Sequence, residues 1–301
     1  MTQRVTLFGR ARYFFRNYVV HGRVRVFLQY LFTKFQALFI QPTILPYFVT
    51  FFPHRKSSYS YMIPKVAPRA EGAELPVPPE KLWYGYGKTA EEWLDSGKKH
   101  VGNMRRILDE SGHSFAEESR ILEFGCAGAR MLRCFADEAE KGEVWGTDIS
   151  ADHIVWCKQY LSPPFHFFTT TTAPHLPFED GYFDFIYAGS VFTHIDDLTD
   201  AWLMELRRVT KKDGKLYITI HDNDTIRILS QQKDFIAKTL SCHKHYYENR
   251  DFGMFTIGRF MRSQVFYDSE YLTEMLDPFF ETLSITPEAY DFQTAFLLRK
   301  K

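Results

Sequence analysis

The first 70 residues of this 301-residue chain contain no aspartate or glutamate, although they hold eleven of its 37 Lys and Arg residues. The rest of the chain therefore carries 26 basic residues against all 37 acidic ones, and a net charge of zero hides a net of −11 there. This split indicates that the two parts meet different surroundings. Because the acidic part carries the remaining motifs and no nucleic-acid-binding module is recognisable, the sequence disfavours nucleic acid as a partner.

Cysteine is scarce, and the four residues Cys126, Cys134, Cys157 and Cys242 lack the spacing of a disulfide framework or a zinc site. Cys242 lies beside two histidines, but that spacing matches no zinc pattern, so no metal is expected. The N-terminus has no clean apolar core followed by a small-residue cleavage site, which predicts no signal peptide. These observations indicate a reducing compartment, the cytoplasm.

Long apolar runs are missing as well, since the uncharged stretch 35–53 is broken by Pro42 and Pro46. A spanning helix needs about 20 apolar residues, so a transmembrane helix is disfavoured. Val26–Phe39 places its aromatic and aliphatic residues on one helical face. The basic, aromatic extension 1–63 is therefore expected in a membrane interface, peripheral at the inner face. Packing on its own domain or on a partner is the alternative, and an Arg-rich presequence is another.

The remainder of the chain predicts an α/β fold. Five prolines in residues 64–81 indicate an extended linker, and strands and helices alternate through a domain over 82–301. Such alternation predicts a parallel sheet with helices on both faces, ending here in two antiparallel strands. The expected strands lie at about 120–126, 143–149, 165–170, 183–190, 215–222, 279–286 and 292–299, and the expected helices at about 89–111, 129–140, 151–161, 197–210 and 269–276.

Two features near the start of this domain predict a nucleotide pocket. In RILEFGCAGAR, residues 120–130, an apolar strand meets a small-residue turn, and Asp148 ends the next strand. Small residues let the backbone approach a ligand, and the acid takes ribose hydroxyls. Glu123 needs a partner in its buried strand and is expected to accept hydrogen bonds from the turn backbone or a ligand ammonium. An acid so near a pyrophosphate, without a full Gly-X-Gly-X-X-Gly, disfavours a nicotinamide oxidoreductase.

A longer motif follows in PHLPFEDGYFDFIYAGSVFTHIDD, residues 174–197. A turn leads into a buried strand, which opens into small residues and then a helix. That helix is expected to end in VTKKDG, with cations in its last turn and Gly214 as its stop. The strand KLYITIHD, residues 215–222, comes next.

With these motifs the chain resembles the class I S-adenosylmethionine-dependent methyltransferases, of the small-molecule type often labelled type 11 or 12. The family's Gly-Cys-Gly-X-Gly-Arg turn stands here as GCAGAR, residues 125–130. The resemblance implies a doubly wound, seven-stranded, mostly parallel sheet with an antiparallel last strand, and S-adenosyl-L-methionine as cofactor. Ala127 and Ala129 replace two usual glycines, which the turn tolerates if φ is negative.

The resemblance also implies roles for matching residues. Glu123 and the turn backbone would hold the methionine part of the cofactor. Asp148 would bind both ribose hydroxyls, with Ile149 against the adenine, and Ser190 would lie beside the sulfonium. The expected cofactor-binding set is Glu123, Gly125, Cys126, Ala127, Gly128, Asp148, Ile149, Thr172, Ala173 and Ser190.

Methyl transfer from a sulfonium is a direct displacement, for which the protein supplies alignment and excludes water. A base is needed only for a protonated acceptor, and the candidates are His194, His221 and Asp222. An insertion, residues 223–267, is expected over the acceptor site, and WYGYG at 83–87 either closes the site from the other side or packs. The expected activity is methylation, with O-methylation favoured, of a small-molecule, glycan or lipid-linked acceptor. The alternative is a catalytically silent interaction module, in which Ala127 and Ala129 would mark the loss of the cofactor.

Overall fold

The computed structural model describes Leu31 and residues 74–232, 240–248, 251–258 and 263–301. All of these but Leu31 belong to one compact unit, Pro64–Lys301. Apart from Leu31, the expected extension 1–63 lies outside the described residues, and so does most of the expected linker 64–81. Within the described part of the chain, no helix has both the length and the apolar character needed to cross a membrane.

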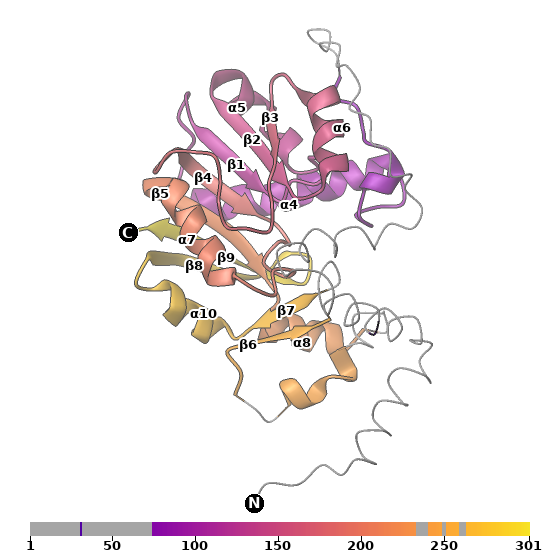
Figure 1. Ribbon diagram of the computed structural model, residues 1–301, viewed down its shortest axis with the longest axis vertical. Coiled ribbons are helices and arrows are strands. Elements are labelled where there is room, and N and C mark those ends of the chain that lie inside the picture. Colours follow the sequence, from indigo (N-terminus) through magenta and orange to yellow (C-terminus); the bar gives the residue numbers. More distant parts are fainter. Residues whose placement is uncertain (1–30, 32–73, 233–239, 249–250, 259–262) are drawn as a thin grey trace, which may run out of the picture. The chain divides into compact units, whose positions relative to one another are not determined.

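Seven strands form one sheet in the order β3-β2-β1-β4-β5-β9-β8 (Figure 1). The first five are parallel, and β9 is antiparallel to both β5 and β8. The expected doubly wound fold is therefore confirmed. The order reverses between β1 and β4, which is where such sheets bind ligands, at the carboxyl ends of the strands. The strands are β1 (Arg120–Phe124), β2 (Glu143–Asp148), β3 (His166–Thr169), β4 (Phe183–Ala188), β5 (Thr210–Ile220), β8 (Phe280–Tyr290) and β9 (Gln293–Lys300).

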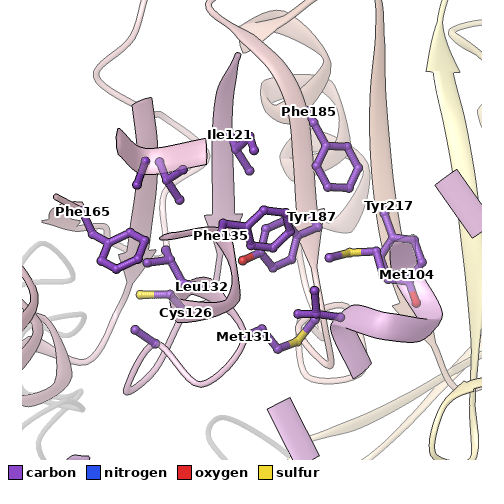
Figure 2. Close-up of a cluster of buried hydrophobic side chains, with 14 of the residues drawn as sticks. Met104, Ile121, Cys126, Met131, Leu132, Phe135, Phe165, Phe185, Tyr187 and Tyr217 are labelled. Carbon is purple, nitrogen blue, oxygen red and sulfur yellow. The ribbon is translucent and has the colours of Figure 1, made fainter. Parts of the chain in front are cut away.

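Helices cover both faces of this sheet, because successive strand residues point to opposite sides. Ile121 belongs to one buried cluster and Leu122 to another. The first cluster, shown in Figure 2, contains side chains of α4, α5 and α6, and the second contains side chains of α7 and α10. The helices are α4 (Ala90–Glu110), α5 (Ala136–Lys141), α6 (Ala151–Leu161), α7 (Thr199–Val209), α8 (Asn223–Ser230) and α10 (Ser269–Leu276), with a short 3-10 helix at Glu80–Leu82.

The segment after β1 differs from the helix expected over 129–140. Ala127 and Ala129 have φ values of 44° and 61°, so the condition of a negative φ is not met at either alanine. A right-handed helix cannot begin at a left-handed residue, and the chain forms a 3-10 helix at Leu132–Phe135 before α5. The left-handed region costs an L-residue about 1–2 kcal/mol, so this turn holds backbone strain at both alanines.

The boundary between α7 and β5 also differs from expectation. The helix ends at Val209 and β5 begins at Thr210, so the residues TKKDG belong to the strand. Asp213, with φ of 62°, takes the left-handed conformation, and the expected stop at Gly214 is wrong. The pairing of β4 with β5 shifts its register between Phe183 and Phe185, which accommodates the early start of β5.

The described part of the insertion 223–267 contains α8, a 3-10 helix at Lys244–Tyr246, and a hairpin of β6 (Met254–Ile257) and β7 (Gln264–Tyr267). Helix α8 and the hairpin share a small aromatic and aliphatic core that includes Phe255 and Phe266. A bridge between His221 and Phe266 continues β5 into the hairpin. The insertion is thus attached at the carboxyl end of β5.

Candidate active site

Gly125 is where the turn after β1 requires glycine. Its φ is 82°, and a Cβ atom there would lie 2.3 Å from Cγ2 of Val191. Val191 follows β4, so the loops after β1 and β4 pack directly at the switch point. The N–H groups of Gly125 and Cys126 both donate to the Thr147 carbonyl oxygen, at 2.8 and 2.9 Å. The turn is thereby anchored to β2.

Asp148 closes the turn from the end of β2. Its Oδ2 accepts a hydrogen bond from the Ala127 N–H at 2.8 Å, and its Oδ1 accepts one from the Ser150 N–H at 2.7 Å. A carboxylate has about four acceptor sites, so this oriented group can still receive two hydroxyls. Ile149 beside it is 58% exposed. A nucleoside has ribose hydroxyls from which a carboxylate such as Asp148 could accept hydrogen bonds, and a base that could pack on an exposed apolar side chain such as Ile149.

Glu123 is buried in β1, and its Oε2 accepts a hydrogen bond from the Tyr187 hydroxyl at 3.1 Å. Burial raises the pKa of Glu123 to about 8, while the Tyr187 hydroxyl and the charge of Arg130 oppose that rise. The side chain is therefore mostly protonated at neutral pH. A cation placed beside it would favour its carboxylate form.

Cys126 faces away from the expected ligand. Its Sγ lies among core residues, 3.7 Å from the Ala127 carbonyl oxygen, and Cys157 Sγ lies 3.5 Å from the same oxygen. Burial raises the pKa of both thiols. The side chain of Cys126 thus supports the shape of the turn.

The segment after β3 carries Thr172 and Ala173, which are both exposed. It starts beside Asp148, whose carbonyl oxygen accepts a hydrogen bond from the Thr170 N–H at 3.1 Å. The Ala173 N–H donates to Thr171 Oγ1 at 3.2 Å. The structure thus attaches this segment to the same end of β2 as Asp148 and Ile149.

Ser190 lies after β4 in a left-handed conformation, with φ of 57°. Its N–H donates to Thr219 Oγ1 at 2.7 Å, Thr219 Oγ1 donates to Gln293 Oε1 at 2.7 Å, and Gln293 Nε2 donates to Ser190 Oγ at 2.8 Å. This closed ring of neutral groups joins β4, β5 and β9. Sequence reasoning missed Thr219 and Gln293, because only the antiparallel placement of β9 brings Gln293 to this edge.

The three candidate bases lie in different environments. His194 is exposed, and its Nδ1 lies 2.8 Å from the Ser263 carbonyl oxygen. His221 is 2% exposed, and burial, followed by the charge of His194, lowers its pKa to about 3. Asp222 is buried, caps α8 by accepting from the Thr225 N–H at 3.0 Å, and accepts from the Ser269 hydroxyl. The structure gives His221 and Asp222 packing and capping contacts, and it leaves His194 open to solvent.

The segment before α4 also approaches Asp148. The Tyr84 ring lies 4.5 Å from the ring of His153, and His153 contacts Ser150 Oγ at 2.8 Å. Burial and then the charge of Asp148 raise the pKa of Tyr84. Gly128 faces the same segment, since a Cβ atom there would lie 3.1 Å from Pro78 Cγ. Residues 78–84 thus border the turn and Asp148.

These groups fit S-adenosylmethionine. Asp148 has spare acceptor sites for ribose hydroxyls, and Ile149 offers an apolar face for the adenine. Glu123 is a buried acid that is hydrogen-bonded to the neutral Tyr187 phenol and to the backbone at Leu132. The set thus contains one carboxylate with spare acceptor sites and one buried acid. Across the described residues, no group of three or more His, Cys, Asp or Glu side chains could hold a metal ion.

One family model matches part of this chain, and several solved structures are similar to it. Residues 122–218 match the family model described as a methyltransferase domain. The chain is similar to the 1,6-didemethyltoxoflavin-N1-methyltransferase of Burkholderia thailandensis, solved with S-adenosylhomocysteine, at 14% identity over 69% of this chain and 80% of that one, with a TM-score of 0.48. It is also similar to a putative S-adenosylmethionine-dependent methyltransferase of Listeria monocytogenes, at 16% identity over 68% and 99% of the two chains, with a TM-score of 0.46. The family match lies between β1 and β5 of the doubly wound sheet, so this part of the chain is identified as a methyltransferase domain.

Proposed function

We propose that the protein methylates a hydroxyl group of a small-molecule, glycan or lipid-linked acceptor, with His194 as the general base. The exposed position of His194, four residues after Ser190 and beyond the carboxyl end of β4, carries this proposal. An acceptor with a free lone pair needs no base, whereas a hydroxyl must lose its proton. A histidine directed to solvent at this edge therefore favours O-methylation.

The contacts described above support the following proposal for the cofactor-binding residues. The carboxylate of Asp148 would accept the ribose hydroxyls, and Ile149 would pack against the adenine, with Thr172 and Ala173 at its edge. Glu123 and the backbone of the turn at Gly125 and Gly128 would hold the methionine part, and Ser190 would lie beside the sulfonium. The bound cofactor supplies an activated methyl group, so the protein has to align the acceptor and exclude water.

In this proposal the acceptor hydroxyl gives its proton to the imidazole of His194 while its oxygen forms the new bond to the methyl carbon. The sulfur–methyl bond breaks with its electron pair left on sulfur, so charge and atoms balance. His221 supports this step because burial keeps it neutral, with its pKa at about 3. The protonated imidazole of His194 therefore meets no second positive charge at His221.

The first experiment is calorimetric titration of the purified protein with S-adenosylmethionine, S-adenosylhomocysteine and NADH, alongside Asp148→Ala. Micromolar binding of the first two, lost in the variant, supports the assigned cofactor residues. An acceptor screen with glycans, lipids and small hydroxylated compounds follows, comparing the wild type with His194→Gln. A substrate turned over equally by both proteins would contradict His194 as the base.

A catalytically silent interaction module is the second candidate, and the left-handed conformations of Ala127 and Ala129 favour it, since glycine adopts that region without strain. Absence of cofactor binding by a folded protein would make this candidate the leading one. The same titration thus separates the two.

The extension 1–63 is proposed to hold the enzyme at a membrane surface, on the basis of its basic and aromatic sequence. Anionic lipids attract such segments by about 1 kcal/mol per basic residue. The test compares sedimentation of the full chain and of a chain lacking residues 1–63 with phosphatidylcholine vesicles and with vesicles containing phosphatidylserine. Equal binding of both proteins to the anionic vesicles would overturn this part.

A further inference from the structure

Three hydrogen bonds join the loop after β4 to the insertion at the start of β7. The Val265 N–H donates to the Thr193 carbonyl oxygen at 2.9 Å. The Ser263 hydroxyl donates to the His194 carbonyl oxygen at 2.5 Å, and His194 Nδ1 lies 2.8 Å from the Ser263 carbonyl oxygen. We call these three bonds the latch. Residues 70 positions apart are thereby held side by side at the carboxyl edge of the sheet.

The latch determines which nitrogen of His194 carries the proton. A carbonyl oxygen only accepts hydrogen bonds, so a contact of 2.8 Å requires that Nδ1 be the protonated nitrogen. In a neutral imidazole Nε2 then has a free lone pair. Gln264 Nε2 lies 3.4 Å from the same Nδ1 and would favour the opposite tautomer, but at that distance it is the weaker contact.

The hairpin can hold this position because the Val265 N–H of β7 bonds to the loop after β4. In the antiparallel pair, Val265 lies opposite Thr256 of β6. The Val265 N–H nevertheless bonds to Thr193, so it points away from β6 and toward the loop. The Val265 side chain is fully buried in the core that also contains Phe192. The Val265 end of the latch is therefore held in place by the packing of β7.

We infer that Ser263 is a positioning residue: its carbonyl and hydroxyl groups fix His194 in the Nδ1-protonated tautomer, so that Nε2 is the proton acceptor for the methyl acceptor's hydroxyl. The role of Nε2 rests on the proposed function, whereas the tautomer does not. When Nε2 takes up a proton, the bond from Nδ1 to the Ser263 carbonyl becomes charge-assisted and therefore stronger. The insertion thus supplies part of the base as well as a cover for the acceptor.

The test is nitrogen-15 NMR of the histidine rings in the full-length protein, which needs neither cofactor nor acceptor. The His194 signals, assigned by their absence in His194→Gln, are expected to show a pyrrole-type Nδ1 and a pyridine-type Nε2 in the neutral ring. Ser263→Gly removes the hydroxyl and loosens the backbone, so both signals should move toward the average of two exchanging tautomers. Ser230→Gly makes the same substitution at the exposed end of α8 and should move neither.

A protonated Nε2 in the wild type, or unchanged His194 signals in a folded Ser263→Gly protein, would overturn the inference. S-adenosylhomocysteine affinity, measured on the same samples, should be the same in the wild type and Ser263→Gly, because both latch bonds of Ser263 go to His194, which is not among the residues assigned to the cofactor. Failure of the proposed function would appear as lack of cofactor binding or of methyl transfer, and it would leave the ring signals as described. The two failures are therefore distinguishable.

Discussion

The carboxylate of Asp148 accepts a 2.8 Å hydrogen bond from the backbone N–H of Ala127, which joins the acid at the end of β2 to the turn after β1. Ala127 has φ of 44°, a conformation that is unfavourable for alanine. The acid therefore holds a strained turn in place and also retains acceptor sites for a ligand. If Asp148 binds the cofactor as proposed, binding and local stability are coupled through this one side chain.

Asp148→Asn is expected to impair both properties. The amide keeps one acceptor oxygen for the two backbone N–H groups, and an unpaired buried donor costs about 1–3 kcal/mol. We expect unfolding stability to fall by about that amount, measured by urea denaturation, and affinity for S-adenosylhomocysteine to fall at least about tenfold, measured by calorimetry. Asp152→Asn, at an exposed position in the first turn of α6, is the control. Equal effects of the two substitutions would contradict the assignment.

Ala127→Gly and Ala129→Gly test the strain in the turn. Glycine relieves about 1–2 kcal/mol at a left-handed position, against a loss of up to about 1 kcal/mol in chain entropy. Ala127 is partly exposed, so its replacement is expected to stabilise the protein by up to about 1 kcal/mol. Ala129 is fully buried, and the loss of its methyl contacts, about 0.8 kcal/mol, should bring its net effect near zero.

The same variants address the silent-module alternative. If the alanines mark loss of the cofactor, the unmodified chain should fail to bind S-adenosylhomocysteine and the double glycine variant should bind it. If the chain is active, both proteins should bind with affinities within a few-fold of each other. Urea denaturation and calorimetry on one set of samples measure both effects.

Local signals in the sequence predicted much of the fold. The expected helices 151–161 and 269–276 coincide with α6 and α10, because an apolar period and a cap residue define each of them. Asp148 at the end of β2 was also predictable, since an acid after a short strand is a local pattern. The capping role of Asp222 had a signal too, because it lies four and seven residues before the apolar positions Ile226 and Leu229 of α8.

What the sequence did not predict depends on long-range contacts. The φ values of Ala127 and Ala129 follow from closure of the turn onto Thr147 and Asp148, which sequence reasoning cannot position. Gln293 contacts Ser190 only because β9 enters the sheet antiparallel beside β5. The pairing of His194 with Ser263 depends on how the insertion folds back, and neither residue carries a local pattern for it.

His221→Phe is expected to reduce the acid sensitivity of the protein. The pKa of His221 is lowered from 6.5 to about 3 in the folded state, so protonation favours unfolding. The stabilising contribution of the neutral ring to the free energy of unfolding is complete above pH 6.5. It is lost as the pH falls toward 3, at up to about 1.4 kcal/mol per pH unit. The ring centre lies 5.0 Å from that of Phe266 and 5.7 Å from that of Phe292, so phenylalanine keeps the aromatic packing and loses the hydrogen bond with the Val265 backbone at both pH values.

Urea denaturation at pH 7 and pH 5 measures this effect. The stability of His221→Phe relative to the wild type should rise by about 1–2 kcal/mol between the two values. His166→Phe, at an exposed position of β3, should show no such rise. A parallel pH dependence of the wild type and His221→Phe would show that another group causes the loss of stability in acid.

The raised pKa of Glu123 leads us to expect that cofactor binding releases a proton. Its pKa of about 8 leaves the folded protein mostly protonated there at pH 7, and a bound ammonium group would favour the carboxylate. Titrations with S-adenosylhomocysteine at pH 7, in buffers that differ in ionisation enthalpy, should therefore show release of up to about one proton. Glu123→Gln keeps the shape of the side chain and should abolish that release while weakening binding. Proton release that persists in a folded Glu123→Gln protein would show that another group titrates. It would contradict the proposed contact between Glu123 and the ammonium group of the cofactor.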